Sequence, residues 1–222
     1  MPRRSAAAVA DTKAEVLDVA VRRASVDGLE GLTIGRLAGE LSMSKSGLHG
    51  MFGSKEELQV ATFEQAVEDF TREVWEPVAR REPGLPRLHA LIDRWLAYHR
   101  RRVLPGGCFV TTATIEFDAR PGQLRDAVAG ARRRMHAALA ADVRAAVDAG
   151  DLPAATDPAD VAFALYAIAS AASQAIQLGE PGASARARRC MRALLTKSNP
   201  ERRHPRQAGD DRLSGGGGGG AA

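Results

Sequence analysis

Basic and small polar side chains gather in one segment, residues 33–58, which reads TIGRLAGELSMSKSGLHGMFGSKEEL. Lys45, Ser46, Gly47 and His49 stand close together in it, and the apolar residues around them recur at helical spacing. Ammonium, hydroxyl and imidazole groups on a short exposed helix are donors that phosphate oxygens and base edges accept. The segment therefore predicts two short helices joined by a turn, with the second helix placed to enter the major groove of DNA.

The two short helices share a small apolar core that leaves the polar side chains outside. The residues assigned to this core are Ile34, Leu37, Leu41, Met43, Leu48 and Phe52. Gly47 and Gly50 each cost a helix about 1 kcal/mol relative to alanine, so tertiary packing must hold the second helix together. Glycine also permits close approach to a partner surface, which favours DNA at this position.

Hydroxyl residues precede each helical run in this part of the chain. Thr33, Ser44 and Ser54 are predicted N-caps, and Ser54 forms a capping box with Glu57. Lys55 follows in the first turn, where backbone amides and an ammonium together favour a phosphate. Alternatives stay open: Thr33 and Ser44 acting only as caps, and Lys55 being an ordinary surface lysine.

No other cluster of side chains indicates catalysis or metal binding. Cys108 and Cys190 are the only cysteines, which argues against a disulfide framework or a zinc site and suits a reducing compartment. His89, His99 and His136 lack the spacing of metal ligands, and no nucleophile–base pair is evident. The sequence therefore predicts that the protein is not an enzyme and holds no metal or cofactor.

The elements that must position these residues are almost all helical, so the sequence predicts an all-α fold. Three regions are expected: a helix-turn-helix domain with a short basic arm over residues 1–53, a larger helical ligand-binding and dimerisation domain over 54–197, and a disordered glycine-rich tail over 198–222. Helices are expected at Thr12–Gly28 (with Thr12 and Glu15 as a capping box), Ser54–Val78, Gly122–Ala149, Pro158–Leu178 (with Asp157 as an acidic N-cap) and Gly182–Thr196.

The overall charge and hydropathy limit the partners. A formal net charge of +4 is compatible with nucleic acid but does not prove it, and the arginine runs at 100–102 and 132–134 are interpreted as solvated helix faces. There is no secretory signal, and no apolar stretch of about 18 residues is recognised. We therefore expect a cytoplasmic protein without membrane contact.

Residues 12–70 resemble the signature of the tetracycline-repressor family of transcriptional regulators. The match comprises an apolar first helix, the pattern T-I-x-x-L-A-x-x-L, a serine-bounded turn, a short helix ending in phenylalanine, and S-K-E-E-L opening a long connector. The family usually has tyrosine where this chain has His49, and an imidazole there would bind phosphate in a pH-dependent way. The resemblance implies that Thr33, Ser44, His49 and Lys55 contact the DNA backbone and that Lys45, Ser46 and Gly47 face the bases.

The resemblance further implies a ligand-responsive repressor that acts as a homodimer on a palindromic, double-stranded operator. The last two helices are expected to form the dimer, because the helix from Pro158 to Leu178 is rich in small residues. The residues that could line an effector pocket could instead be ordinary core residues. The alternative function is an all-helical small-molecule binding protein or enzyme that does not bind an operator. The candidate pocket residues for a small-molecule effector are Trp75, Trp95, Tyr98, Phe109, Thr112, Glu116 and Tyr166.

Overall fold

A computed structural model describes residues 6–196, and the fold is all-α over that range, as predicted. The predictions for the basic arm and for the glycine-rich tail lie outside the described residues. The elements in chain order are α1 (Ala6–Asp27), α2 (Ile34–Glu40), α3 (Lys45–Phe52), α4 (Lys55–Phe70), the π-helix η1 (Thr71–Trp75), the 3₁₀ turn η2 (Glu76–Val78), α5 (Leu85–Arg101), α6 (Phe109–Phe117), α7 (Gln123–Asp148), α8 (Pro158–Gln177) and α9 (Ala183–Leu194).

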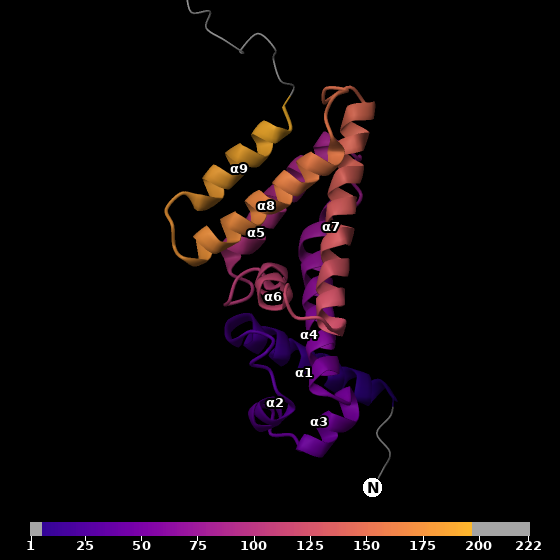
Figure 1. Cartoon of the computed structure of the whole chain (residues 1–222), viewed down its shortest axis with the longest axis vertical. Helices are drawn as coiled ribbons and strands as arrows, with labels where there is room; N and C mark the ends of the chain where they lie inside the picture. The colour runs from indigo at the N-terminus through magenta and orange to yellow at the C-terminus, as the bar shows by residue number, and fades with distance from the viewer. Residues whose placement is uncertain (1–5, 197–222) are drawn as a thin grey trace, which may run out of the picture.

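The helices form a small head and a larger body (Figure 1). α1, α2 and α3 make the head at one end, and α4 leads out of it into the body. α7 runs along much of the body and packs against α4, α6 and α8, while α5, α8 and α9 pack together at the far end. α4 thus connects the head with the body.

Four helices begin at the N-caps that the sequence predicts. At α3, for example, the Ser44 hydroxyl oxygen accepts a hydrogen bond from the Gly47 amide at 3.0 Å. Such a bond satisfies one of the amides that a helix N-terminus leaves without a partner. The four capping residues are Thr33, Ser44, Ser54 and Asp157.

The start of the first helix was predicted wrongly. The capping box at Thr12 predicts a start there, whereas α1 begins at Ala6 and carries Thr12 in its interior. Alanine has the highest helix propensity, and four of the first five residues of α1 are alanine. Extending the helix towards the N-terminus through these alanines therefore costs little free energy, and the helix does not begin at the Thr12 capping box.

The connector is helical throughout from Lys55 to Val78, but it is not one uniform α-helix. At Thr71 the α-helical turns of α4 widen into the π-helix η1, and the chain then tightens into η2. The Thr71 hydroxyl donates to the Val67 carbonyl oxygen at 2.8 Å, and Pro77 has no amide hydrogen to continue an α-helical ladder. The apolar spacing alone does not reveal this change of register.

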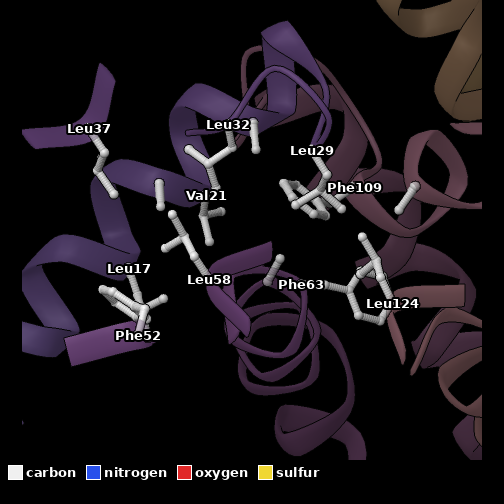
Figure 2. Close-up of a cluster of buried hydrophobic side chains, with 14 of the residues drawn as sticks. Leu17, Val21, Leu29, Leu32, Leu37, Phe52, Leu58, Phe63, Phe109 and Leu124 are labelled. Atoms are coloured by element: carbon white, nitrogen blue, oxygen red, sulfur yellow. The ribbon is translucent and has the colours of Figure 1, made fainter. Parts of the chain in front are cut away.

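The hydrophobic core of the head continues into the body. Leu17, Leu37 and Phe52 belong to the same buried cluster as Phe109 of α6 and Leu124 of α7. Figure 2 shows these side chains converging on Leu58 and Phe63 of α4. Within the described residues the core therefore does not divide at residue 53, and the head is packed against the body rather than hung from a linker.

α8 departs from the expectation on membrane segments. By length and composition it is the one described helix that is apolar enough to cross a membrane. In the fold one side of it packs against α5, α7 and α9, and 33% of its apolar window is buried.

The loop before α6 approaches α1 so closely that it requires a glycine. A Cβ atom on Gly106 would lie 1.4 Å from the Ser25 carbonyl oxygen, and the Gly106 amide donates to the Ser25 hydroxyl at 3.3 Å. We expect Gly106→Ala to lower the free energy of unfolding by about 1–3 kcal/mol, because the overlap forces the backbone apart. Urea denaturation measures this change directly.

The matched control places the same methyl group in open space. Gly39 lies in α2, and nothing lies within 4 Å of its potential Cβ. Gly39→Ala should therefore raise the free energy of unfolding by up to about 1 kcal/mol through helix propensity. Equal urea midpoints for the two variants would contradict the close approach at Gly106.

Candidate nucleic-acid interface

Helix α3 has one buried face and one exposed face. Leu48 is fully buried and Phe52 is 6% exposed, so this side is fixed in the core of the head. Every residue predicted to read or contact DNA from α3 is exposed: Lys45, Ser46, Gly47 and His49. The structure thus brings these four residues together on one surface, as the sequence analysis expected.

The exposed face of α3 presents donors and no acidic side chain. The helix reads KSGLHGMF, so within it the charge comes from lysine alone, with His49 adding an imidazole. The Lys45 side chain passes close to Gly35 of α2: a Cβ atom on Gly35 would lie 3.4 Å from the Lys45 Cε. This position keeps the ammonium at the start of α3.

Thr33 and Ser44 use their hydroxyl oxygens as caps. Thr33 Oγ1 accepts from the Arg36 amide at 3.3 Å, and Ser44 Oγ accepts from the Gly47 amide and from the Ser46 hydroxyl. In each case the capping hydroxyl acts as an acceptor. A cap and a phosphate contact are therefore chemically compatible, because the hydroxyl can accept from the helix and donate to an anion.

Lys55 lies at the start of α4 and already has a carboxylate partner. Its Nζ donates to Glu30 Oε1 at 2.7 Å, and Arg120 Nη1 lies 3.5 Å from the other oxygen of the same carboxylate. The hydrogen bond from Lys55 and the two positive charges lower the pKa of Glu30. Sequence reasoning missed Glu30 and Arg120, because neither lies at helical spacing from Lys55.

A second contact joins the head to the body through Glu116 of α6. Its carboxylate accepts from the Leu29 amide at 2.9 Å and from the Glu30 amide at 2.7 Å. A Cβ atom on Gly28 would lie only 2.9 Å from an oxygen of this carboxylate. Gly28 also has a φ of +76°, a conformation that favours glycine. Glu116 therefore fixes the turn after α1, whereas the sequence analysis expected it in a ligand pocket.

The seven residues proposed for the effector pocket do not surround one cavity. Thr112 and Glu116 line a groove of about 590 Å³ between α1, α6 and α8, and Trp75 lines a smaller groove of about 340 Å³ beside α4 and α7. The remaining four are buried side chains: Trp95, Tyr98, Phe109 and Tyr166. Trp95 lies 6.3 Å from the Tyr166 ring centre, within a larger aromatic cluster.

Two polar atoms in that aromatic cluster have no hydrogen-bond partner among the described residues. They are Trp95 Nε1 and His99 Nε2, which lie one turn apart on α5. His99 is 6% exposed, and this burial lowers the pKa of its imidazole to about 4. The described residues contain no group of three or more histidine, cysteine or acidic side chains placed to hold a metal ion.

The body of the chain matches a family model. Residues 84–191 match the model described as the tetracyclin repressor-like C-terminal domain. A search of curated proteins found no match.

Solved structures with the same fold cover most of the chain. A TetR transcriptional regulator from Chloroflexus aurantiacus superposes with a TM-score of 0.75 at 22% identity, covering 84% of this chain and 93% of its own. A TetR-family regulator from Cytophaga hutchinsonii gives 0.74 at 18% identity, covering 87% and 96%. AibR, solved with isovaleryl coenzyme A and operator DNA, gives 0.61 at 20% identity, covering 76% and 95%. At these identities the likeness shows the fold.

The family model and the fold agree with each other. The model covers α5 to α8 and most of α9, and the solved structures extend the likeness over most of the chain. Residues 84–191 belong to the family of tetracyclin repressor-like C-terminal domains, and the chain has the fold of TetR-family transcriptional regulators.

Proposed function

We propose that this chain is a sequence-specific DNA-binding regulator, a ligand-responsive repressor that acts in the cytoplasm as a homodimer on a palindromic operator. The observation that carries the proposal is the exposed face of α3, which presents Lys45, Ser46, Gly47 and His49 without an acidic side chain. Its opposite face is packed into the head, so the exposed one can enter a major groove as a rigid unit.

The residues around α3 suit the DNA backbone. Thr33 and Ser44 cap α2 and α3, and Lys55 lies in the first turn of α4. Three helix N-termini thus contribute backbone amides and hydroxyl groups near the reading helix, and such groups favour phosphate oxygens. In this proposal these contacts fix the orientation of the head, while the start of α3 reads the bases.

The outer face of α8 supports the proposal of a homodimer. Phe163 is 61% exposed and Leu178 is 80% exposed, although both are large apolar side chains. Between them Ala167 and Ala171 are also exposed, at the spacing of one helical face. Small residues let helices pack closely, so a second copy of this face would cover the stripe. On the last helix, by contrast, Met191 and its C-cap Leu195 are buried within the chain.

A small-molecule effector is proposed from the fold and from one relative. AibR, which shares the fold, was solved with both isovaleryl coenzyme A and operator DNA. In this chain α6 contacts the head through Glu116 and also borders two grooves of the body. A ligand that favours one arrangement of head and body would change operator affinity by its difference in affinity for the two states.

The decisive experiment is selection of bound duplexes from a random DNA pool at a fixed salt concentration. The proposal predicts enrichment of an inverted repeat, since a two-fold dimer reads two equivalent half-sites. A pool without any enriched sequence would contradict operator binding and favour a small-molecule binding protein or enzyme with the same fold.

Two lysine substitutions separate base reading from backbone contact. Lys45→Ala should change the preference among sequences by about 1–3 kcal/mol at the contacted base. Lys55→Ala should weaken all duplexes by a similar factor, because a phosphate contact carries no sequence information. Fluorescence anisotropy with the selected operator and with single-base variants measures both effects. Unchanged binding by both variants would show that the reading surface lies elsewhere.

A further inference from the structure

A groove between α6 and α7 combines an apolar floor with a strongly basic rim. Its volume is about 470 Å³, which is within the range of small-molecule sites. Phe117, Val128 and Ala129 provide apolar surface, and Arg125, Arg132 and Arg133 provide guanidinium groups. The single acidic side chain in the lining is Asp118, so the rim carries a net positive charge.

The basic residues of this groove share one face of α7. Arg125, Ala129, Arg132 and Arg133 follow each other at intervals of four, three and one residue. That spacing places them on neighbouring positions of one helical surface. The fold thus concentrates positive charge beside apolar surface, instead of distributing it around the helix.

Two of these arginines keep an uncompensated charge in the part of the chain that the structure describes. Arg132 and Arg133 form no ion pair with a carboxylate among the described residues, whereas Arg87, Arg101 and Arg188 each pair with an acidic side chain within 3 Å. Arg132 instead lies over the Tyr166 ring, 4.7 Å from its centre, and donates to the Tyr166 hydroxyl at 3.4 Å. These contacts orient the guanidinium without cancelling its charge.

His136 completes the wall of the groove as a hydrogen-bonding group. Burial and the neighbouring positive charge of Arg132 lower the pKa of its imidazole, so the ring is neutral near pH 7. The positive charge of the groove therefore resides on the arginines. Arginine is the side chain best suited to bind a carboxylate, sulfonate or phosphate through two parallel hydrogen bonds.

From this arrangement we propose that the groove is the effector site and that it takes an anionic amphipath: an apolar ring or acyl group carrying a carboxylate, sulfonate or phosphate. The inference rests on the proposed ligand-responsive function and assigns a site and a ligand class to it. The floor covers the apolar part, and Arg132 and Arg133 bind the anion.

Two other grooves of the body suit such a ligand less well. The groove of about 590 Å³ beside α8 contains Glu116, whose carboxylate would repel an anion, and it includes the exposed Ile115 and Leu178 close to the proposed dimer stripe. The groove of about 340 Å³ beside Trp75 offers a single arginine, Arg134.

The groove also borders the helix that holds the head. Thr114 and Phe117 of α6 line it, and between them Glu116 accepts from the backbone amides of Leu29 and Glu30. A ligand lodged between α6 and α7 therefore acts on the helix that fixes the turn after α1. In this proposal the carboxylate of Glu116 is one of the contacts through which occupation of the groove acts on the head.

The test compares two fluorescent probes that share one ring system. 8-Anilinonaphthalene-1-sulfonate carries a sulfonate, and N-phenyl-1-naphthylamine has the same rings without it. The full chain should bind the sulfonate probe at least about tenfold more tightly than the neutral one, as a charge-assisted bidentate contact requires. Equal affinities for the two probes would overturn the assignment of an anion site.

Three variants locate the binding. Arg133→Gln should weaken the sulfonate probe about tenfold and leave the neutral probe unchanged. Ala129→Trp should abolish binding of both probes by filling the groove. Arg134 is adjacent to Arg133 in the sequence but lines another groove, so Arg134→Gln should leave the affinity for both probes unchanged. Sulfonate binding that persists in both Arg133→Gln and Ala129→Trp would show that the probe binds elsewhere and would refute the proposal.

The result is independent of DNA binding. Probe titrations need no operator, so their failure leaves the proposed regulator function standing. Conversely, a chain that binds no DNA but shows the expected probe pattern would retain the anion site and lose the regulator function. The melting temperature of each variant, measured alongside, confirms that loss of probe binding is not loss of the fold.

Discussion

Replacing Ala167 and Ala171 of α8 by glutamate is expected to convert the protein into a monomer and to reduce operator affinity by at least about a hundredfold. Both alanines are exposed in the single chain, on the apolar stripe between Phe163 and Leu178. In a two-fold dimer each new carboxylate would face apolar surface and the same carboxylates of the second copy. Each head would then bind its half-site alone. Sedimentation velocity at micromolar concentration and operator titration measure the two effects.

The outer face of α7 provides a matched control for this double substitution. Ala137 and Ala141 have the same spacing and are also exposed. Ala137→Glu with Ala141→Glu adds identical charge to the chain and should leave the protein dimeric. A parent chain that sediments as a monomer, or a control that dissociates as readily as the α8 variant, would exclude α8 as the interface.

The buried imidazole of His99 should make the protein markedly less stable in acid. Its pKa is lowered to about 4 in the folded state, against a reference value of 6.5 in the unfolded chain. Above pH 6.5 the contribution of His99 to the free energy of unfolding is fully present. It is lost as the pH falls towards 4, because in that range the unfolded chain takes up the proton and the folded chain does not. The loss from this one residue amounts to about 3 kcal/mol at 1.36 kcal/mol per pKa unit.

His99→Phe isolates that contribution. Phenylalanine keeps a ring beside Trp95 and Tyr98 and removes the titrating nitrogen, which has no hydrogen-bond partner among the described residues. Urea denaturation at about pH 7.5 and about pH 4 should show a smaller acid loss for the variant, by about 3 kcal/mol. Identical acid losses would mean that the His99 imidazole is solvated in the folded protein.

Local signals in the sequence were sufficient where the deciding interaction is itself local. Ser44 and Ser54 cap helices because their hydroxyls reach an amide three residues ahead, which spacing alone reveals. The exposed and buried faces of α3 follow in the same way from helical periodicity. Where two local signals compete, the sequence is ambiguous: at α1 the alanine-rich start prevails over the capping box at Thr12.

The features that sequence reasoning missed depend on tertiary packing. The pairing of Lys55 with Glu30, the hold of Glu116 on the turn after α1, and the close approach of Gly106 to Ser25 join residues from different helices and loops. The run Arg132–Arg133–Arg134 was interpreted as a solvated helix face, and Arg133 and Arg134 are exposed; only the fold shows that the first two line an apolar groove and that the third lines another. The resemblance implied an effector pocket that includes Trp95, Tyr98 and Tyr166, whereas all three side chains are buried: Trp95 packs against Tyr166, and Tyr98 packs against Phe70.

The pairing of Lys55 with Glu30 has a thermodynamic consequence for operator binding. A phosphate that binds an unpaired lysine releases about one condensed counterion, which makes affinity fall steeply as salt rises. The Lys55 ammonium already has a carboxylate 2.7 Å away, and Arg120 lies 3.5 Å from that carboxylate. If a phosphate takes the ammonium, Glu30 loses this partner, and a cation that it takes up from solution offsets the counterion that the phosphate releases. Lys55 therefore exchanges one anion for another, and its contact with the operator should persist at salt concentrations that disrupt contacts made by unpaired lysines.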